Sequence, residues 1–278
     1  MSKRKGLSLL AKLIILIIFI ILAFIMLVPI IWSLLSAFKP DKQIIQYPPT
    51  FFPTEISMGN FTKVQQRIDI FTYMKNSIIF SLCTTVPSIL INSLAGYAFA
   101  RYKFKGKNVI FLIFLATMMI PLQVIMVPLF LEIHAMGMYN NYWGLIIPKI
   151  ASAYWIFMMR SSFSGLPKEL EEAARIDGLG EFGIYFRIML PQVKPALVTM
   201  LILSVNGNWN DLLWPLISTS SSSMRTLANG LAMFVGAHTI EYGAAFAGSA
   251  ISLIPMLLLY VFGQKYFVEG TVSSGIKG

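Results

Sequence analysis

The sequence predicts an all-α polytopic membrane protein with six transmembrane helices. Two observations support this fold class. Of the 278 residues, 56% are hydrophobic and 12% are charged, against about 45–50% and about 25% in ordinary soluble domains. The hydrophobic residues also cluster in runs of about twenty, the length needed to cross a hydrocarbon layer of about 30 Å. A typical soluble enzyme is therefore excluded.

Six such runs can be placed along the chain. They comprise residues 13–37, 77–100, 109–131, 142–163, 196–217 and 244–267. The basic residues before the first run are typical of a signal peptide, but that run is far longer than the usual apolar region of about 7–15 residues. We therefore expect a cytoplasmic N-terminus over residues 1–12, a six-helix domain over 13–268 and a cytoplasmic tail over 269–278.

The basic residues also predict the orientation of the helices. Most of the 22 Lys and Arg residues fall in segments that share one side of the membrane, if the N-terminus is inside. Cytoplasmic segments of membrane proteins carry such an excess, so both termini are predicted to be cytoplasmic. The net charge of +10 is then explained by orientation in the lipid bilayer, and no nucleic-acid partner is expected.

Two loops are large, and they lie on opposite sides. The outer loop, residues 38–76, is rich in proline, which favours extended segments and turns with a short helix at most. The inner loop, residues 164–195, contains charge and helix signals. Pro167 suits a first helical turn, acidic residues follow it, and Gly178 provides a stop. We expect one helix over 167–177 and a second over 181–190, ended by Pro191.

The first of these short helices has features of a surface that receives a partner. Ala173 and Ala174 remove bulk at one place, so another surface can approach closely, and Glu172 and Arg175 flank them with charge. The alternative is a solvated connector of the kind common in surface loops.

The same loop resembles the EAA signature of the membrane subunits of bacterial ABC importers. The matching residues are Glu172, Ala173, Ala174, Gly178, Ile188, Leu190 and Pro191. The resemblance implies the type I importer permease fold, with the loop inserted into a cleft on an ATP-binding subunit. It also implies a multi-pass protein of a bacterial or archaeal plasma membrane.

The partners that the resemblance implies are a second permease in a heterodimer, two ATP-binding subunits and an extracytoplasmic sugar-binding protein. ATP and Mg²⁺ would be bound by the ATP-binding subunits, and no cofactor is expected in this chain, whose sequence contains no phosphate-binding loop. The protein is accordingly expected to be a transport subunit without catalytic residues.

Further segments look like carbohydrate permeases, in particular the smaller permease of maltose-type importers. They are residues 119–121, 141–145, 167–170, 209–211 and 214–215. Gly275, Lys277 and Gly278 look like the tail of that type, which reaches between the two ATPase subunits. A frayed terminus is the alternative for these three residues.

The fifth run contains polar residues that could contact a sugar. They are Asn206, Asn208, Trp209, Asn210 and Asp211. Polar groups at this depth require protein or water around them. Asn206 and Asn210 would share one helical face, and the Trp209 ring could stack on a sugar. The alternative is hydrogen bonding between helices, which the resemblance favours, because the larger maltose permease binds most of the sugar.

Other residues are not expected to form sites. His134 and His238 lie in different outer loops without ligand-spaced neighbours, so no metal site is predicted. Residues 178–183 match a Gly-x-Gly-x-x-Gly pattern, but no strand precedes them, so they predict no nucleotide site. Lys149, inside the fourth run, is expected to extend to the outer interface.

Rival functions remain open. A secondary transporter or channel would normally show paired charges at the bilayer midplane or an inverted repeat, and neither is evident in the sequence. An intramembrane enzyme would need a nucleophile with a base, or a metal cluster. Within the importers, a polyol, a glycerol phosphate or a peptide could replace an oligosaccharide as the substrate.

Overall fold

The computed structural model describes residues 9–236 and 240–275. Its regular structure in these ranges is helical, apart from an isolated antiparallel bridge between Val235 and Ile240. The chain divides into two compact units. The first comprises residues 1–69 and 231–253, and the second comprises residues 70–230 and 254–278.

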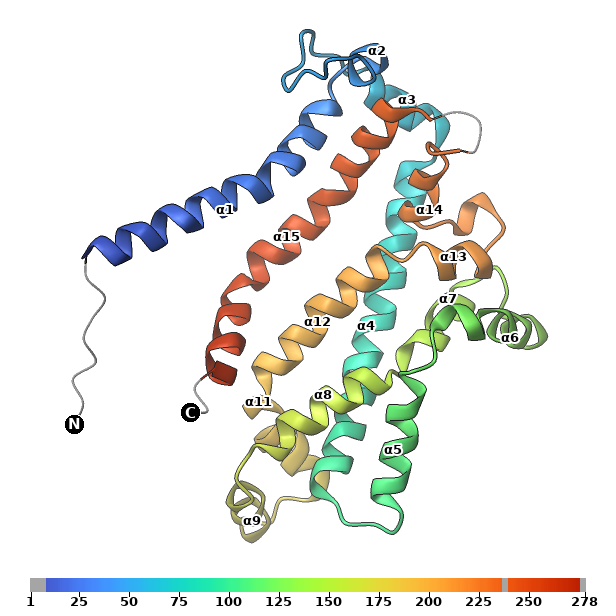
Figure 1. The fold of residues 1–278 in the computed structure, drawn as a ribbon. Coiled ribbons are helices and arrows are strands. Elements are labelled where there is room, and N and C mark those ends of the chain that lie inside the picture. Colours follow the sequence, from blue (N-terminus) through green and yellow to red (C-terminus); the bar gives the residue numbers. More distant parts are fainter. Residues whose placement is uncertain (1–8, 237–239, 276–278) are drawn as a thin grey trace. The chain divides into compact units, whose positions relative to one another are not determined.

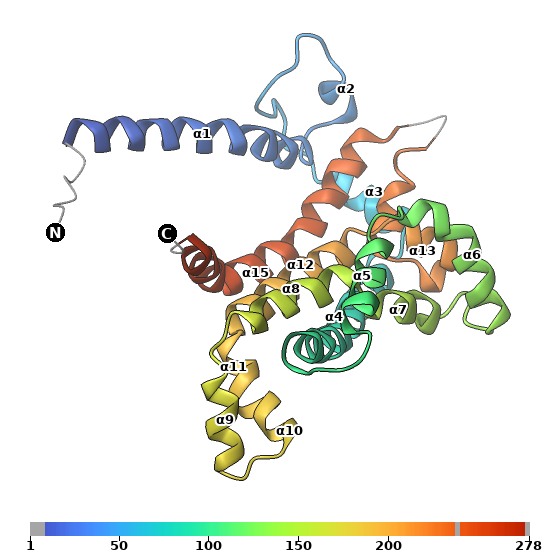
Figure 2. The ribbon, with the colours of Figure 1, turned by 60° about the horizontal axis from the view of Figure 1, so that its bottom comes forward.

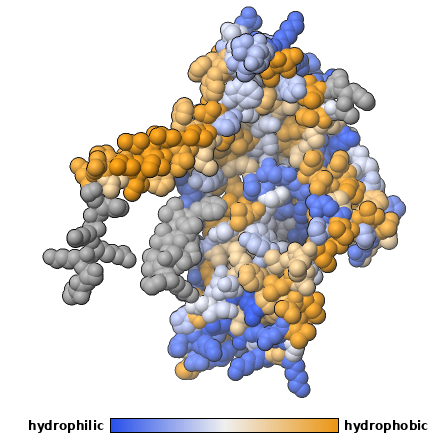
Figure 3. Space-filling view, viewed as in Figure 1, coloured by the Kyte–Doolittle hydropathy of each residue, from blue (hydrophilic) through white to orange (hydrophobic). Residues whose placement is uncertain are grey.

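The first unit contains a long apolar helix, α1 (Leu9–Ser36), and the beginning of α15 (Tyr242–Gly275). Hydrophobic side chains cover α1 on all sides and most of them are exposed (Figure 3). A helix that is hydrophobic all round is expected to be surrounded by lipid or protein. Near the end of α1, the Trp32 ring meets Phe246 of α15 edge-on, with ring centroids 5.4 Å apart.

The loop after α1 is held together by side-chain amides. It contains α2 (Asp41–Ile44) and α3 (Gly59–Arg67). The Asn60 amide donates to the carbonyls of Ala37 at 2.9 Å and Lys39 at 2.8 Å. The next helix begins at residue 70, so the outer loop ends before residue 76, where we expected it to end. The reason is local: residues 70–76 contain neither Gly nor Pro to interrupt the helix.

The second unit is built around α4 (Ile70–Arg101), against which α7 (Tyr142–Ile150), α8 (Ala153–Ser164) and α12 (Lys194–Trp209) pack (Figure 1). Gly96 permits the close approach of α4 and α8. A Cβ atom at this position would lie 2.6 Å from the Met159 Cβ and 2.8 Å from the Arg160 backbone nitrogen. Small residues at helix contacts are typical of membrane bundles.

The prediction of six continuous transmembrane helices is not confirmed in the described residues. By length and composition, three helices can cross a membrane, namely α1, α4 and α15, or up to five if each sharply bent pair counts as one span. The third predicted run is such a pair: α5 (Lys107–Thr117) and α6 (Leu122–Ala135) are bent by 99°. Pro121 explains this break, because proline disfavours a helical conformation in the residue before it.

The fourth and fifth runs are also interrupted. Between α7 and α8, the Asn92 side chain of α4 replaces the missing backbone hydrogen bonds: it donates to the Ile150 carbonyl at 2.8 Å and accepts from the Ser152 amide at 2.9 Å. In the fifth run, α12 ends at Trp209, and the chain continues as a second helix, α13 (Leu213–Ser218). A short 3₁₀ turn (Ser222–Met224) and α14 (Leu227–Ala232) follow.

The last helix extends further than the sequence indicated. We expected the helical domain to end at residue 268, but α15 continues to Gly275. Gly275 therefore ends a helix, whereas Lys277 and Gly278 lie outside the described residues. Residues 269–274 contain no proline, so the backbone can continue its helical hydrogen bonds.

Candidate functional site

The inner loop folds into short helices at one end of the second unit. The first, α9 (Glu169–Ile176), ends before Gly178, whose φ of +82° is accessible mainly to glycine. The chain continues through α10 (Glu181–Gly183), a π-helical turn (Ile184–Met189) and α11 (Leu190–Gln192). In Figure 2, α9 and α10 project beyond the helices that the loop joins.

Two short helices were predicted here, and the loop contains them. The second extends beyond its expected end at Pro191, to Gln192. The π-helical turn continues directly into α11, and the proline ring keeps a φ that suits a helix, so the backbone stays helical for one more residue.

A buried ion pair joins α9 to α4. Glu171 accepts hydrogen bonds from Arg101 Nε at 2.9 Å and from the Tyr97 hydroxyl at 2.8 Å. The side chains of Arg101 and Glu171 are only 6% and 7% exposed. Arg101 also donates to the carbonyls of Leu166 and Pro167, each at 3.0 Å. One guanidinium thus holds the start of α9 and the segment before it to the end of α4.

Sequence reasoning missed the special position of Glu171. It lies among several acids at the start of the helix, and nothing in the local sequence distinguishes it from Glu172. A weak signal exists in the spacing: Glu171 and Ala174 are three residues apart and share the buried face of α9. The arginine that completes the pair lies 70 residues away in the sequence.

A second polar contact closes the turn after α9. Glu181 accepts from Arg175 Nε at 3.0 Å and from the Tyr102 hydroxyl at 2.6 Å. These two hydrogen bonds hold the pKa of the Glu181 carboxyl below its usual value, and the one from Arg175 has the larger effect. Burial and the bond to Glu181 raise the pKa of Tyr102 to about 12. Tyr102 therefore stays a neutral donor at physiological pH.

The second half of the loop packs against the helices of its unit. Ile184, Tyr185 and Met189 are buried in a cluster with Met159 and Phe163. The Tyr185 hydroxyl lies 2.6 Å from Ser93 Oγ on α4. Ile188 is partly buried against the same cluster, whereas Phe182 at the start of this segment is 74% exposed.

The motif residues consequently divide into two groups. Glu172, Ala173 and Gly178 are exposed, and Ile176 beside them is 86% exposed. Ala174 is buried and contacts the apolar cluster, as do Ile188 and Leu190, which are partly buried. Pro191 is exposed. One side of α9 is thus available to another protein, while the other side is joined to this chain.

The polar residues of the fifth run lie at the break between α12 and α13. As expected, Asn206 and Asn210 share a face: the Asn210 amide donates to the Asn206 carbonyl at 2.9 Å and to its side chain at 3.0 Å. Both residues are exposed. Asn208 instead is buried and donates to Thr85 Oγ1 on α4 at 3.4 Å.

Trp209 does not present its ring on the surface, because it is only 3% exposed. The expectation that it offers a flat face to a sugar is therefore wrong for this arrangement of the chain. The packing of α12 on α4 places Asn208 and Trp209 inside the unit, and Asn206 and Asn210 outside it.

Asp211 forms an ion pair with Lys149 of α7. The Asp211 carboxylate also accepts a hydrogen bond from the Trp214 backbone amide at 3.3 Å. This bond stabilises the start of α13. Lys149, which we expected to extend to the outer interface, has its ammonium group held by this carboxylate. Paired charges within the hydrophobic runs were not evident from the sequence, because the partners lie 62 residues apart.

The histidines give no support for a metal site. Within the described residues, no group of three His, Cys, Asp or Glu side chains could hold a metal ion. His134 packs beside the rings of Phe130 and Tyr139. His238 lies outside the described residues.

Membrane-length apolar helices, a projecting helical loop and a polar break in a helix are typical of integral membrane transport proteins. Residues 88–272 match the family described as the binding-protein-dependent transport system inner membrane component, and the chain belongs to this family. It is therefore a transport subunit of ABC importer type rather than an enzyme, as the resemblance of its loop indicated.

Relatives of known name agree with this assignment over nearly the whole chain. The arabinooligosaccharides transport system permease protein AraQ of Halalkalibacterium halodurans is 38% identical over 263 residues, with 94% of each chain covered. The trehalose/maltose transport system permease protein MalG of Thermococcus litoralis is 34% identical, with 93% of this chain and 94% of that one covered. The expected similarity to maltose-type permeases is confirmed.

Solved structures show the same fold. A chain of a bacterial ABC transporter that imports the acidic polysaccharide alginate superimposes with a TM-score of 0.79 at 23% identity, with 96% of this chain and 99% of that chain covered. A chain of a bacterial alginate ABC transporter, in complex with an alginate pentasaccharide-bound periplasmic protein, gives a TM-score of 0.66 at 16% identity.

Proposed function

We propose that this chain is one of two permease subunits of an ATP-driven importer of an oligosaccharide or a related sugar. The names of its relatives support a sugar, since they include permeases for arabinooligosaccharides, lactose and trehalose or maltose. The second permease completes a heterodimer, and an extracytoplasmic binding protein delivers the sugar. Both termini face the cytoplasm of a bacterial or archaeal cell, where two ATP-binding subunits bind ATP and Mg²⁺.

The observation that carries the coupling proposal is the two-sided character of α9. Its exposed side, with Glu172, Ala173 and the turn at Gly178, enters a cleft on an ATP-binding subunit. Its buried side is fixed to α4 by Arg101 and Glu171. When the ATP-binding subunits close, α9 moves as a rigid body and takes the end of α4 with it, which is a known way to switch a bundle between two states.

The inward-facing motif residues have a supporting role in this proposal. Ala174, Ile188 and Leu190 keep the loop attached to the helices, and Pro191 begins the segment that leads into α12. The C-terminal residues Gly275, Lys277 and Gly278 extend toward the interface between the ATP-binding subunits.

The sugar pathway is assigned to the exposed side of the break after α12. Asn206 and Asn210 offer amide groups, which suit sugar hydroxyls. Asp211 follows Asn210 in the sequence and forms an ion pair with Lys149 of α7. Asn208 and Trp209 serve this pathway indirectly, by fixing α12 in the unit.

Charge reversal on α9 tests the coupling. Glu172→Lys reverses charge on the exposed side, and Glu169→Lys is its matched control, because Glu169 is exposed on the same helix but lies outside the motif. With the purified complex in liposomes, we expect Glu172→Lys to abolish sugar-stimulated ATP hydrolysis and uptake while the protein still inserts. Equal activity of both variants would refute the coupling role of α9.

A further inference from the structure

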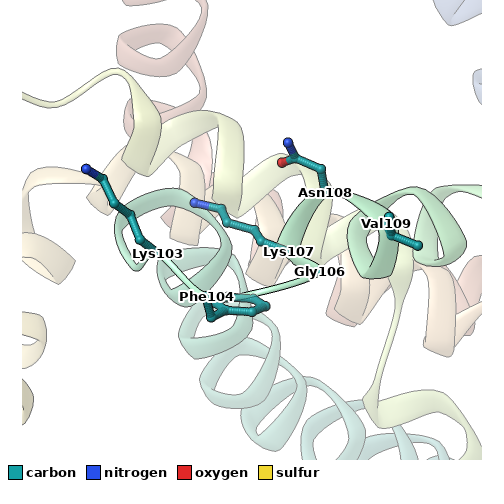
Figure 4. A pocket seen from close by; sticks show the side chains of 6 residues that line it. All are labelled: Lys103, Phe104, Gly106, Lys107, Asn108 and Val109. Carbon is teal, nitrogen blue, oxygen red and sulfur yellow. The ribbon is translucent and has the colours of Figure 1, made fainter.

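The turn between α4 and α5 contains an open hollow of about 400 Å³. Its lining residues are Lys103, Phe104, Gly106, Lys107, Asn108 and Val109. In Figure 4, the side chains of Lys103, Lys107 and Asn108 extend to the same side of the turn. A volume in this range is typical of small-ligand sites.

Positive charge is concentrated here without acidic neighbours in the sequence. Lys103, Lys105 and Lys107 alternate along the turn, and no Asp or Glu occurs between Asp69 and Glu132. None of the ion pairs formed by the described side chains involves these three lysines. Arg160 of α8 adds to the local positive potential, since it acts on Lys107 by charge repulsion. Such a cluster attracts an anion.

The ammonium group of Lys107 is held by two hydrogen bonds and has a third N–H donor available. Its ammonium group donates to the Tyr102 carbonyl at 2.8 Å and to the Ala100 carbonyl at 3.4 Å. An ammonium group has three donors, so one remains for a ligand. The first turn of α5 begins beside it at Gly106, which has a φ of +79° and provides no side-chain cap. Backbone amides at such a helix start favour negative charge.

The surroundings indicate which kind of anion is bound. The hollow lies where the membrane-length helix α4 ends and the apolar helix α5 begins. Phe104 and Val109 of the lining are 42% and 63% exposed, and Ile110 next to them is 41% exposed. Apolar side chains beside lysines at the end of a membrane helix are typical of the lipid–water interface, where basic clusters recognise anionic headgroups.

We propose that this hollow, the Lys103–Lys107 site, binds the phosphate headgroup of an anionic phospholipid in the cytoplasmic leaflet. Lys103 and Lys107 contact the phosphate, Asn108 donates from its amide, and Phe104 with Val109 contacts the glycerol and the first carbons of the acyl chains. The inference rests on the proposed orientation of the chain, with this turn inside the cell.

Lipid binding to the complete purified transporter tests this site. Native mass spectrometry of the delipidated complex in mild detergent measures the binding of phosphatidylglycerol, with phosphatidylcholine as the neutral lipid. We expect a preference for phosphatidylglycerol, and a loss of about fivefold in its affinity for each lysine removed in Lys103→Gln/Lys107→Gln. Lys103→Arg/Lys107→Arg should keep the preference.

Two further variants separate the site from general effects. Lys103→Gln/Lys105→Gln leaves the bonds of Lys107 intact, so it should weaken lipid binding even if the first variant folds poorly. Lys42→Gln/Lys75→Gln removes the same charge from exposed positions in the loop before α4 and at its start, and should leave binding unchanged.

Several results would overturn the proposal. Equal binding of the two lipids, or an undiminished preference in Lys103→Gln/Lys105→Gln, would exclude a headgroup site. Inorganic phosphate that binds as tightly as the lipid would show a soluble anion instead. Loss of an ATP-binding subunit from the variants with no change in lipid binding would show a protein contact. The lipid measurement requires neither sugar nor ATP, so it is independent of whether the importer assignment holds.

Discussion

Arg101 at the end of α4 and Glu171 on α9 form an ion pair in which both side chains are more than nine-tenths buried. The pair joins α9 to α4, the longest helix of the second unit. Arg101 also donates to the carbonyls of Leu166 and Pro167, so the start of α9 is attached to α4 at more than one point. In the proposed function, this attachment lets α9 pass a displacement on to α4.

This ion pair predicts a non-additive mutational pattern. Arg101→Met or Glu171→Met leaves one buried charge unpaired and should lower stability by about 3–5 kcal/mol. The double variant Arg101→Met/Glu171→Met should be less destabilised than the sum of the two, because no buried charge is left alone. Thermal unfolding in detergent, read together with ATP-coupled uptake, measures both effects.

The surface pair of Lys63 and Asp41 supplies the control. Its side chains are 46% and 36% exposed, so Lys63→Gln should change stability by about 1 kcal/mol or less. Additive losses in the Arg101 and Glu171 variants, of the size seen for Lys63→Gln, would mean that the buried pair makes no special contribution.

Gly178 should tolerate no β-branched residue. The space around a Cβ atom is open, since nothing lies within 4 Å, so the cost of Gly178→Val arises from the backbone φ of +82° and should be about 1–3 kcal/mol. We expect the turn after α9 to rearrange and coupled ATP hydrolysis to fall. Gly180→Ala is the control, because Gly180 has a φ of −71°, and it should retain activity in the same ATPase assay.

Helix contact at Gly96 is expected to be essential for assembly of the second unit. Gly96→Leu would place side-chain atoms against Met159 and the Arg160 backbone, forcing α4 and α8 apart. Detergent-resistant folding and protease protection should be lost. Gly207→Ala is the counterpart on α12, where an added Cβ meets nothing within 4 Å. If Gly96→Leu folds as well as Gly207→Ala, the packing of α4 on α8 is not close in the membrane.

The Lys149–Asp211 pair should control transport more than assembly. Lys149→Met leaves the Asp211 carboxylate without its cation, and Asp211→Asn removes the matching charge; each should slow uptake several-fold while the ATP-binding subunits still bind. The exchanged variant Lys149→Asp/Asp211→Lys restores the pair and should recover part of the rate. Initial rates of sugar uptake in liposomes give the comparison, and no recovery in the exchanged variant would argue against a direct contact.

The hydrophobic runs were predictable because span length and hydropathy are properties of neighbouring residues. Each of the three helices of membrane length overlaps a predicted run, although α4 and α15 extend beyond theirs. The loop helices around Glu172 and Phe182 were expected from their start and stop signals. The interruptions were harder to foresee. Pro121 gave a local signal for one, whereas the gap between α7 and α8 depends on hydrogen bonds from Asn92, which is distant in the sequence.

By itself, the sequence determined the class of protein and the location of its proposed coupling loop, because both are encoded in residues close along the chain: apolar runs of membrane length and the spacing from Glu172 to Pro191. Only the tertiary structure decided which acid anchors the loop, which polar residues of the fifth run stay exposed, and where Lys149 finds its partner. Those choices depend on burial and charge between residues 62 to 123 positions apart, and a buried charge is stable only where folding brings it a partner.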